Sequence, residues 1–116
     1  MTHAHAIEIV PSTQVVTVSY KGVVLAETKH ALVLREGRLP PRYYIPEADV
    51  RMELLTPTSK HTVCPFKGTA SYWSVRVGDE LLPDLVWSYP DPIPDATEIA
   101  GMLCFYNERV EIDASG

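Results

Sequence analysis

The stretch QVVTVSYKGVVLAE, residues 14–27, decides the fold class of this chain. Its first half places Val16, Val18 and Tyr20 on one side and β-branched or small polar residues on the other, an alternation typical of a strand. Lys21 and Gly22 then supply a turn in which the glycine tolerates a positive φ, and VVLAE runs back as a second strand. The stretch therefore predicts a β-hairpin.

Short apolar segments separated by turn residues continue along the chain. ALVLRE, residues 31–36, extends the hairpin into a three-stranded meander that Gly37 closes. Further strands are predicted at MELLT (52–56), HTVC (61–64), TASYWSVRV (69–77), the segment 80–89, MLCFY (102–106) and RVEID (109–113). This spacing predicts a compact, mainly β fold.

Ten prolines leave little room for long helices, because proline lacks the backbone donor and clashes with the preceding turn. LPPRYYIPEADV, residues 39–50, must be extended or turning, with a helical turn at 46–49. PDPIP, residues 90–94, is predicted to be a polyproline-like arm, and the capping pattern of Asp95 and Glu98 predicts helical turns over 96–100. We expect one or two short helical turns in an otherwise all-β fold.

The length and net charge of the chain limit the classes of protein to which it can belong. The 116 residues make one domain, 1–116, and 46% hydrophobic against 22% charged residues is a globular composition. A net charge of −5 disfavours nucleic acid and anionic membranes as partners, and no apolar run approaches the roughly 20 residues that span a bilayer. No secretory signal is readable, so we expect a cytoplasmic protein whose residues 1–12 are a frayed segment.

Cysteine and histidine usage predicts neither a disulfide nor a metal site. Cys64 and Cys104 are expected to be free thiols in a reducing compartment, and two cysteines cannot build a four-thiolate zinc site. His3 and His5 lie two residues apart, but a frayed terminus explains them more simply than a metal site. We therefore expect no metal and no cofactor.

Four large aromatic residues gather in ASYWSV (70–75) and VWSYP (86–90). Trp87 and Tyr89 share one face of their strand, whereas Tyr72 and Trp73 point to opposite faces. Whether Tyr72 or Trp73 joins Trp87 depends on the register, because a tight turn at 78–79 and a longer loop over 78–83 give different answers. The aromatic residues either wall a pocket for a flat or cationic ligand, or fill a small β core.

The sequence offers two further candidate sites, a reactive thiol and an anion-binding site. Cys64 precedes Lys67 by three residues, and a nearby lysine favours the reactive thiolate, so Cys64 is a candidate nucleophile. A buried cysteine acting as a small hydrophobe is the alternative. Lys67 and Arg42 are also candidates for an anion site, since one bidentate arginine is enough to orient a carboxylate or phosphate.

A family resemblance rests on PPRYYIP, DVRMELL, TVCPFKG, ASYWSV, VWSYPDPIP and IAGMLCFY. In their order and spacing these strings resemble the family catalogued as domain of unknown function 427, over residues 15–113. The resemblance implies a small bacterial-type β-tent domain, related in shape to methionine sulfoxide reductase B and the cereblon ligand-binding domain but without their zinc. It also implies a binding site where two sheets meet, at Trp73, Trp87 and Tyr89. Some catalogues label the family nucleotidyltransferase-like.

The expected architecture is an all-β, antiparallel, β-tent or barrel-like single domain. As function we expect a module that binds a small molecule or a peptide, with a pocket lined by Arg42, Tyr44, Lys67, Tyr72, Trp73, Trp87 and Tyr89. One alternative is a thiol-dependent enzyme with Cys64 and Lys67 as catalytic residues. Another is a self-associating subunit, a homodimer that pairs through exposed sheet edges.

Overall fold

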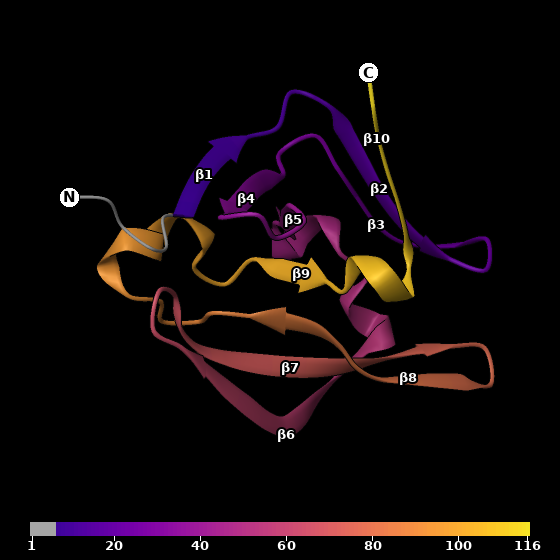
Figure 1. The fold of residues 1–116 in the computed structure, drawn as a ribbon. Helices are drawn as coiled ribbons and strands as arrows, with labels where there is room; N and C mark the ends of the chain where they lie inside the picture. The colour runs from indigo at the N-terminus through magenta and orange to yellow at the C-terminus, as the bar shows by residue number, and fades with distance from the viewer. Residues whose placement is uncertain (1–6) are drawn as a thin grey trace.

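Two open antiparallel sheets make up the computed structural model, which describes residues 7–116 (Figure 1). The larger sheet has seven strands in the order β1-β4-β5-β9-β8-β7-β6, and the smaller has three in the order β10-β2-β3. The strands are β1 (Ile7–Pro11), β2 (Val15–Tyr20), β3 (Val23–Thr28), β4 (Leu32–Glu36), β5 (Arg42–Ile45), β6 (Leu55–Cys64), β7 (Gly68–Val77), β8 (Glu80–Ser88), β9 (Leu103–Phe105) and β10 (Glu111–Ser115).

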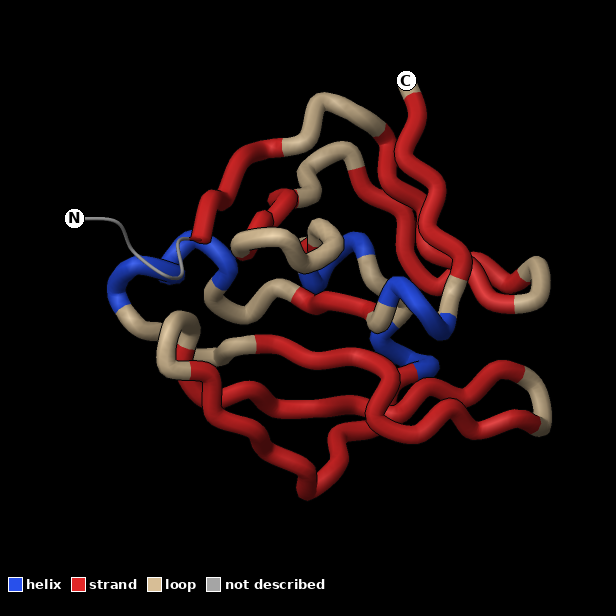
Figure 2. Tube along the Cα trace, in the orientation of Figure 1, coloured by secondary structure: helices blue, strands red, loops and turns tan. Residues whose placement is uncertain are grey.

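All helices among the described residues are short 3-10 segments (Figure 2). They are η1 (Glu47–Asp49), η2 (Met52–Leu54), η3 (Pro94–Ile99) and η4 (Asn107–Arg109). The mainly β prediction is therefore confirmed, with four helical segments instead of one or two. Because η2 takes Met52–Leu54, the strand predicted from residue 52 begins only at Leu55. None of these helices is long and apolar enough to cross a membrane.

The hairpin predicted from the opening stretch is confirmed, but the meander is wrong. β2 and β3 pair around Lys21 and Gly22, whose φ angles are both positive. The chain then leaves this sheet at Thr28, whose buried hydroxyl donates to Asp49 at 2.7 Å and accepts the His30 N–H at 2.9 Å. As a result β4 pairs with β1 and β5 in the other sheet.

The N-terminal prediction needs correction as well. Ile7–Pro11 do not fray: they form β1, with Ile9 opposite Leu34 of β4, and Ile7 and Ile9 pack against buried side chains. Residues 1–6, with both N-terminal histidines, lie outside the described residues. The larger sheet also does not close into a barrel, because β1 and β6 remain at its two ends.

Each face of the larger sheet carries its own core, because successive strand residues point to opposite faces. The inter-sheet core, between the two sheets, buries Val18 and Leu25 of the smaller sheet with Val86 and Phe105 of the larger. The aromatic core lies on the face turned away from the smaller sheet and is covered in part by η3. Its buried members are Leu34, Tyr44, Ala70, Tyr72, Trp87, Tyr89, Ala96, Ile99 and Cys104.

Candidate functional site

The register between β7 and β8 decides which aromatic residues meet. Val77 pairs with Glu80, so the hairpin turn is the tight one at residues 78–79. An uninterrupted ladder from this turn would place Leu85 opposite Tyr72. A bulge instead shifts the pairing by two residues, so that Trp87 lies opposite Tyr72. Within the bulge Asp84 has a positive φ, and its N–H donates to the Ser74 hydroxyl at 3.1 Å.

A row of paired residues then crosses five strands of the aromatic face: Tyr72, Trp87, Cys104, Tyr44 and Leu32. Paired residues point to the same side of a sheet, so the row is continuous. Because the Cys104 side chain is small, the Trp87 indole reaches across it and donates to the Tyr44 hydroxyl at 3.0 Å. The two rings are T-shaped with centroids 6.5 Å apart.

Beside this row lies a pocket of about 210 Å³. Its lining residues are Leu34, Glu36, Leu39, Pro40, Arg42, Lys67, Tyr72, Trp87, Tyr89 and Tyr106. Five residues expected from the sequence therefore come together here: Arg42, Lys67, Tyr72, Trp87 and Tyr89.

Two expected residues are placed elsewhere. Tyr44 is fully buried and supports Trp87 without lining the pocket. Trp73 points to the opposite face, where it packs half-buried against the inter-sheet core. Of the three residues expected where the two sheets meet, Trp73 does lie there, but the placement of Trp87 and Tyr89 is wrong, because strand alternation turns both away from the smaller sheet.

Glu36 and Tyr106 line the pocket but were not among the residues expected for it. Strand alternation carried a signal for both. Glu36 shares a face with Leu34, two residues earlier, and Tyr106 follows Cys104 at the same interval. A spacing of two residues shows only that two side chains share a face of the strand. Without the position of the pocket, it does not single out Glu36 or Tyr106 as lining residues.

An ion pair closes the pocket on one side. Lys67 Nζ lies 2.8 Å from Glu36 Oε1, and each side chain is 11% exposed. Glu36 ends β4 and Lys67 directly precedes β7, with β5, β9 and β8 between these strands. In a flat sheet β4 and β7 would be about 19 Å apart, four spacings of about 4.8 Å. The sheet must therefore curl around the pocket for the two charges to meet.

The turn that carries Lys67 is fastened by the proline arm. The Ile93 N–H donates to the Lys67 carbonyl at 3.0 Å. Gly68 has a φ of +119°, and a Cβ there would lie 3.3 Å from Pro92 Cα. A glycine is needed at this position both for its backbone conformation and for the close approach of the arm. The arm thus holds Lys67 at the edge of the pocket.

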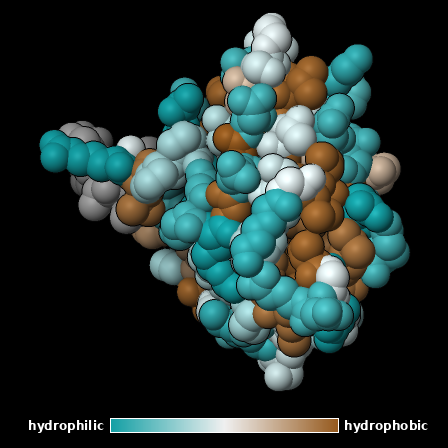
Figure 3. Space-filling model, turned by 90° about the vertical axis from the view of Figure 1, so that its right-hand side faces the viewer, coloured by the Kyte–Doolittle hydropathy of each residue, from teal (hydrophilic) through white to brown (hydrophobic). Residues whose placement is uncertain are grey.

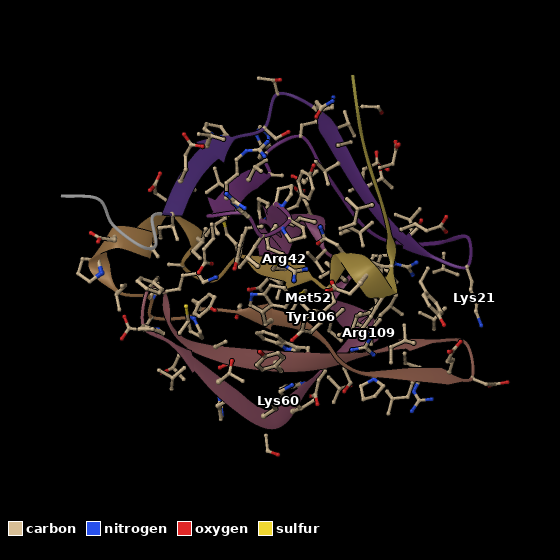
Figure 4. The ribbon with its side chains drawn as sticks, viewed as in Figure 1. Lys21, Arg42, Met52, Lys60, Tyr106 and Arg109 are labelled. Carbon is tan, nitrogen blue, oxygen red and sulfur yellow. The ribbon has the colours of Figure 1, made fainter. Side chains whose placement is uncertain are left out.

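Arg42 lies over two rings near the centre of the molecule, as Figure 4 shows for Arg42 and Tyr106. Its guanidinium carbon is 5.2 Å from the ring centroid of Trp87 and 5.8 Å from that of Tyr106. Nη1 donates to Glu108 Oε1 at 2.9 Å and to Asn107 Oδ1 at 3.4 Å. The Nε and Nη2 donors make no hydrogen bond to any residue from 7 to 116.

Each ring of the pocket is paired with a cation of the protein itself. Lys67 Nζ lies 5.8 Å from the Tyr89 ring centroid and Lys60 Nζ lies 4.6 Å from that of Tyr72, while Arg42 covers the other two rings. Cations are drawn to the negative faces of aromatic rings. The ring faces available to an external cation are therefore partly occupied.

Burial changes the ionisation of the pocket tyrosines. It raises the pKa of Tyr106 from 10.0 to about 12, with the neighbouring Tyr72 hydroxyl adding to the effect. Burial also raises the pKa of Tyr44 and of Tyr89. The hydroxyls of Tyr89 and Tyr106, which line the pocket, stay protonated at neutral pH, where they can donate hydrogen bonds to a ligand.

We expect the Tyr106→Phe variant to lose less stability in alkali than the wild-type protein. Because the pKa of Tyr106 is higher in the folded chain than in the unfolded one, its neutral form stabilises the fold fully below about pH 10. That contribution is lost as the pH rises towards about 12. Urea unfolding at a series of alkaline pH values measures the loss, and equal losses in both proteins would contradict the assignment.

Both cysteines are free thiols. Cys104 is fully buried in the aromatic row, and burial raises the pKa of its thiol. Cys64 is partly buried and does not line the pocket, and its carbonyl accepts the Lys67 N–H at 3.2 Å. The Lys67 ammonium bonds with Glu36, not with the Cys64 thiol. Thiol chemistry at Cys64 remains a prediction. Over residues 7–116, no three His, Cys, Asp or Glu side chains gather in a group that could hold a metal ion.

The fold and site define a mainly β domain of two open antiparallel sheets, with a small aromatic pocket on the face of the larger sheet turned away from the smaller. Residues 8–116 match the profile of a family described as a domain of unknown function, DUF427, and the chain belongs to this family. The match confirms the resemblance of its sequence strings. A comparison with curated proteins gave no match.

Proposed function

We propose that the protein binds a small organic anion, a carboxylate attached to a flat apolar group, in the aromatic pocket. The observation that carries this proposal is the Arg42 guanidinium, which lies against Trp87 in the pocket lining and whose Nε and Nη2 donors have no hydrogen-bond partner among residues 7–116. These two N–H groups have the fork geometry that binds a carboxylate through both oxygens. The neighbouring rings would contact the apolar part of the ligand.

Size restricts the ligand. Pockets for drug-sized molecules usually measure about 300–1,000 Å³, and this one holds about 210 Å³. It therefore suits a single ring or a short side chain, with anything larger extending into solvent. A free aromatic acid and the C-terminal residue of a peptide share this chemistry.

Charge favours an anion over a cation. The lining contains two cations, Arg42 and Lys67, against one carboxylate, Glu36, which is paired with Lys67. The cation–π contacts already present leave less of the ring faces for a cationic ligand. The sequence suggested a flat or cationic ligand for the aromatic residues and an anion for Arg42 and Lys67. A flat anion fits this pocket better than a cation does.

The test is a titration of the Trp73→Phe variant, in which Trp87 is the only remaining tryptophan and reports on the pocket by its fluorescence. We expect millimolar benzoate to change this emission and to raise the melting temperature. Substituting Arg42→Gln should weaken benzoate binding about tenfold or more, since a hydrogen bond to a charged group contributes about 1.5–3 kcal/mol.

Matched probes and variants separate binding from general charge effects. Arg51→Gln removes the same charge from an exposed arginine that pairs with Glu53 outside the pocket, and should leave benzoate binding unchanged. Benzamide and benzylammonium keep the ring but not the anion, and N-acetylphenylalanine stands for a peptide C-terminus. Stronger binding of benzylammonium than of benzoate, or full benzoate binding by Arg42→Gln, would refute the proposal.

A further inference from the structure

The ion pair between Arg42 and Glu108 stands between two hollows of the surface. Arg42 lines the aromatic pocket, with its side chain 22% exposed. Glu108 is 62% exposed and lines a second hollow of about 320 Å³, together with Tyr20, Lys21 and Arg109. Figure 4 shows Arg109 beside Tyr106, with Lys21 further out at the tip of the β2–β3 hairpin. The carboxylate thus reaches Arg42 from outside the aromatic pocket.

Glu108 is not the only group that holds Arg42 in place. The guanidinium is already positioned by the rings of Trp87 and Tyr106 and by Asn107, whose amide in turn donates to the Pro41 carbonyl at 2.9 Å. What Glu108 adds is a negative charge at 2.9 Å from the group that would bind the anion. The hydrogen bond from Arg42 holds the pKa of Glu108 below its ordinary value, so this charge is present at neutral pH.

We propose that Glu108 is a specificity-determining residue, which makes the pocket select a singly charged carboxylate over a doubly charged phosphate. This inference rests on the proposed function of the pocket. Arg42 carries one positive charge and shares it with Glu108. By Coulomb's law both the attraction of a bound anion to Arg42 and its repulsion by Glu108 double for a dianion. Glu108 therefore cancels much of the extra attraction that Arg42 alone would give a dianion.

The surface around Glu108 offers a matched control. Glu111, at the start of β10, lines the same second hollow and is exposed, but it makes no ion pair with Arg42. Figure 3 shows the face that carries the hairpin tips, where polar side chains surround an apolar strip. Glu108→Gln and Glu111→Gln each remove one negative charge, and glutamine at 108 can still accept a hydrogen bond from Arg42.

The experiment compares benzoate with phenyl phosphate, which share a ring and differ in charge. At about pH 8 the phosphate monoester carries nearly two charges, because its second pKa is about 6. Titrations follow Trp87 fluorescence in the Trp73→Phe background at low ionic strength, since salt screens exposed charges. We expect Glu108→Gln to shift the affinity ratio about threefold towards phenyl phosphate, the size typical of a partly exposed charge pair, and Glu111→Gln to leave the ratio unchanged.

Each result separates this inference from the function on which it rests. If benzoate binds the wild-type pocket but Glu108→Gln leaves the ratio of benzoate to phenyl phosphate affinity unchanged, Glu108 does not set specificity. The proposed anion site is then still supported. If Glu108→Gln weakens both probes, Glu108 positions Arg42, and the inference is overturned. If neither probe binds any of the variants, the anion site itself is wrong and the role of Glu108 fails with it.

Discussion

Replacing Glu36 by glutamine should lower the free energy of unfolding by about 3 kcal/mol, because it leaves the buried Lys67 ammonium without its counter-ion. Both side chains are only 11% exposed, so water replaces little of the lost interaction. The change also weakens the contact between Glu36 and Lys67, which joins the two ends of the curled part of the larger sheet. With a total stability of about 5–15 kcal/mol expected for a domain, a loss of this size is easily measured by urea unfolding.

A double variant shows whether the unpaired charge is the cause. Lys67→Met keeps most of the side-chain volume and removes the ammonium, so the combination with Glu36→Gln should recover at least half of the lost stability. Glu27→Gln, at an exposed position of β3, is the control and should cost less than about 0.5 kcal/mol. If Glu36→Gln costs no more than Glu27→Gln, the ion pair does not stabilise the curl of the sheet.

Trp87→Ala should be the most damaging single substitution, with a loss of about 3–5 kcal/mol. It removes the largest side chain of the aromatic row and leaves the buried Tyr44 hydroxyl without the indole donor. Arg42 loses the ring against which it lies at the same time. Thermal and urea unfolding give the loss of stability, whereas binding cannot be assigned in a variant that barely folds.

Trp87→Phe distinguishes a pocket wall from a core residue. Phenylalanine keeps an aromatic ring but not the indole N–H, so the variant should remain folded while benzoate affinity falls several-fold. Trp73→Phe is the matched control on the opposite face, where no effect on binding is expected. If Trp87→Phe binds benzoate as well as the wild type does, in a melting-temperature assay, Trp87 only fills the core.

Much of the local structure could be predicted from the sequence, because it depends on neighbours in the chain. The alternation around Val16 and Val18 and the glycine at the turn are enough for the first hairpin. The number of prolines predicted that long helices would be absent, and every described helix is a short 3-10 segment. Five of the pocket residues, Arg42, Lys67, Tyr72, Trp87 and Tyr89, could be predicted from the sequence, whereas the aromatic residue Tyr106 could not.

Pairing between distant segments could not be predicted in the same way. The third segment of the predicted meander joins the other sheet, where it pairs with β1, although β1 lies within the terminal segment that we expected to be frayed. Glu36 was missed because a charged residue at the end of an apolar strand is usually exposed, and only the curl of the sheet brings Lys67 to it.

The sequence by itself determined the mainly β fold and which side chains share a face of each strand, because a period of two residues needs no information from elsewhere in the chain. Only the tertiary structure decided that Trp87 lies opposite Tyr72, since the bulge at Asp84 moves the register by two residues. It also decided on which side of the larger sheet the pocket opens. Both depend on where distant strands pair and how strongly the sheet curls, which the local order of residues does not specify.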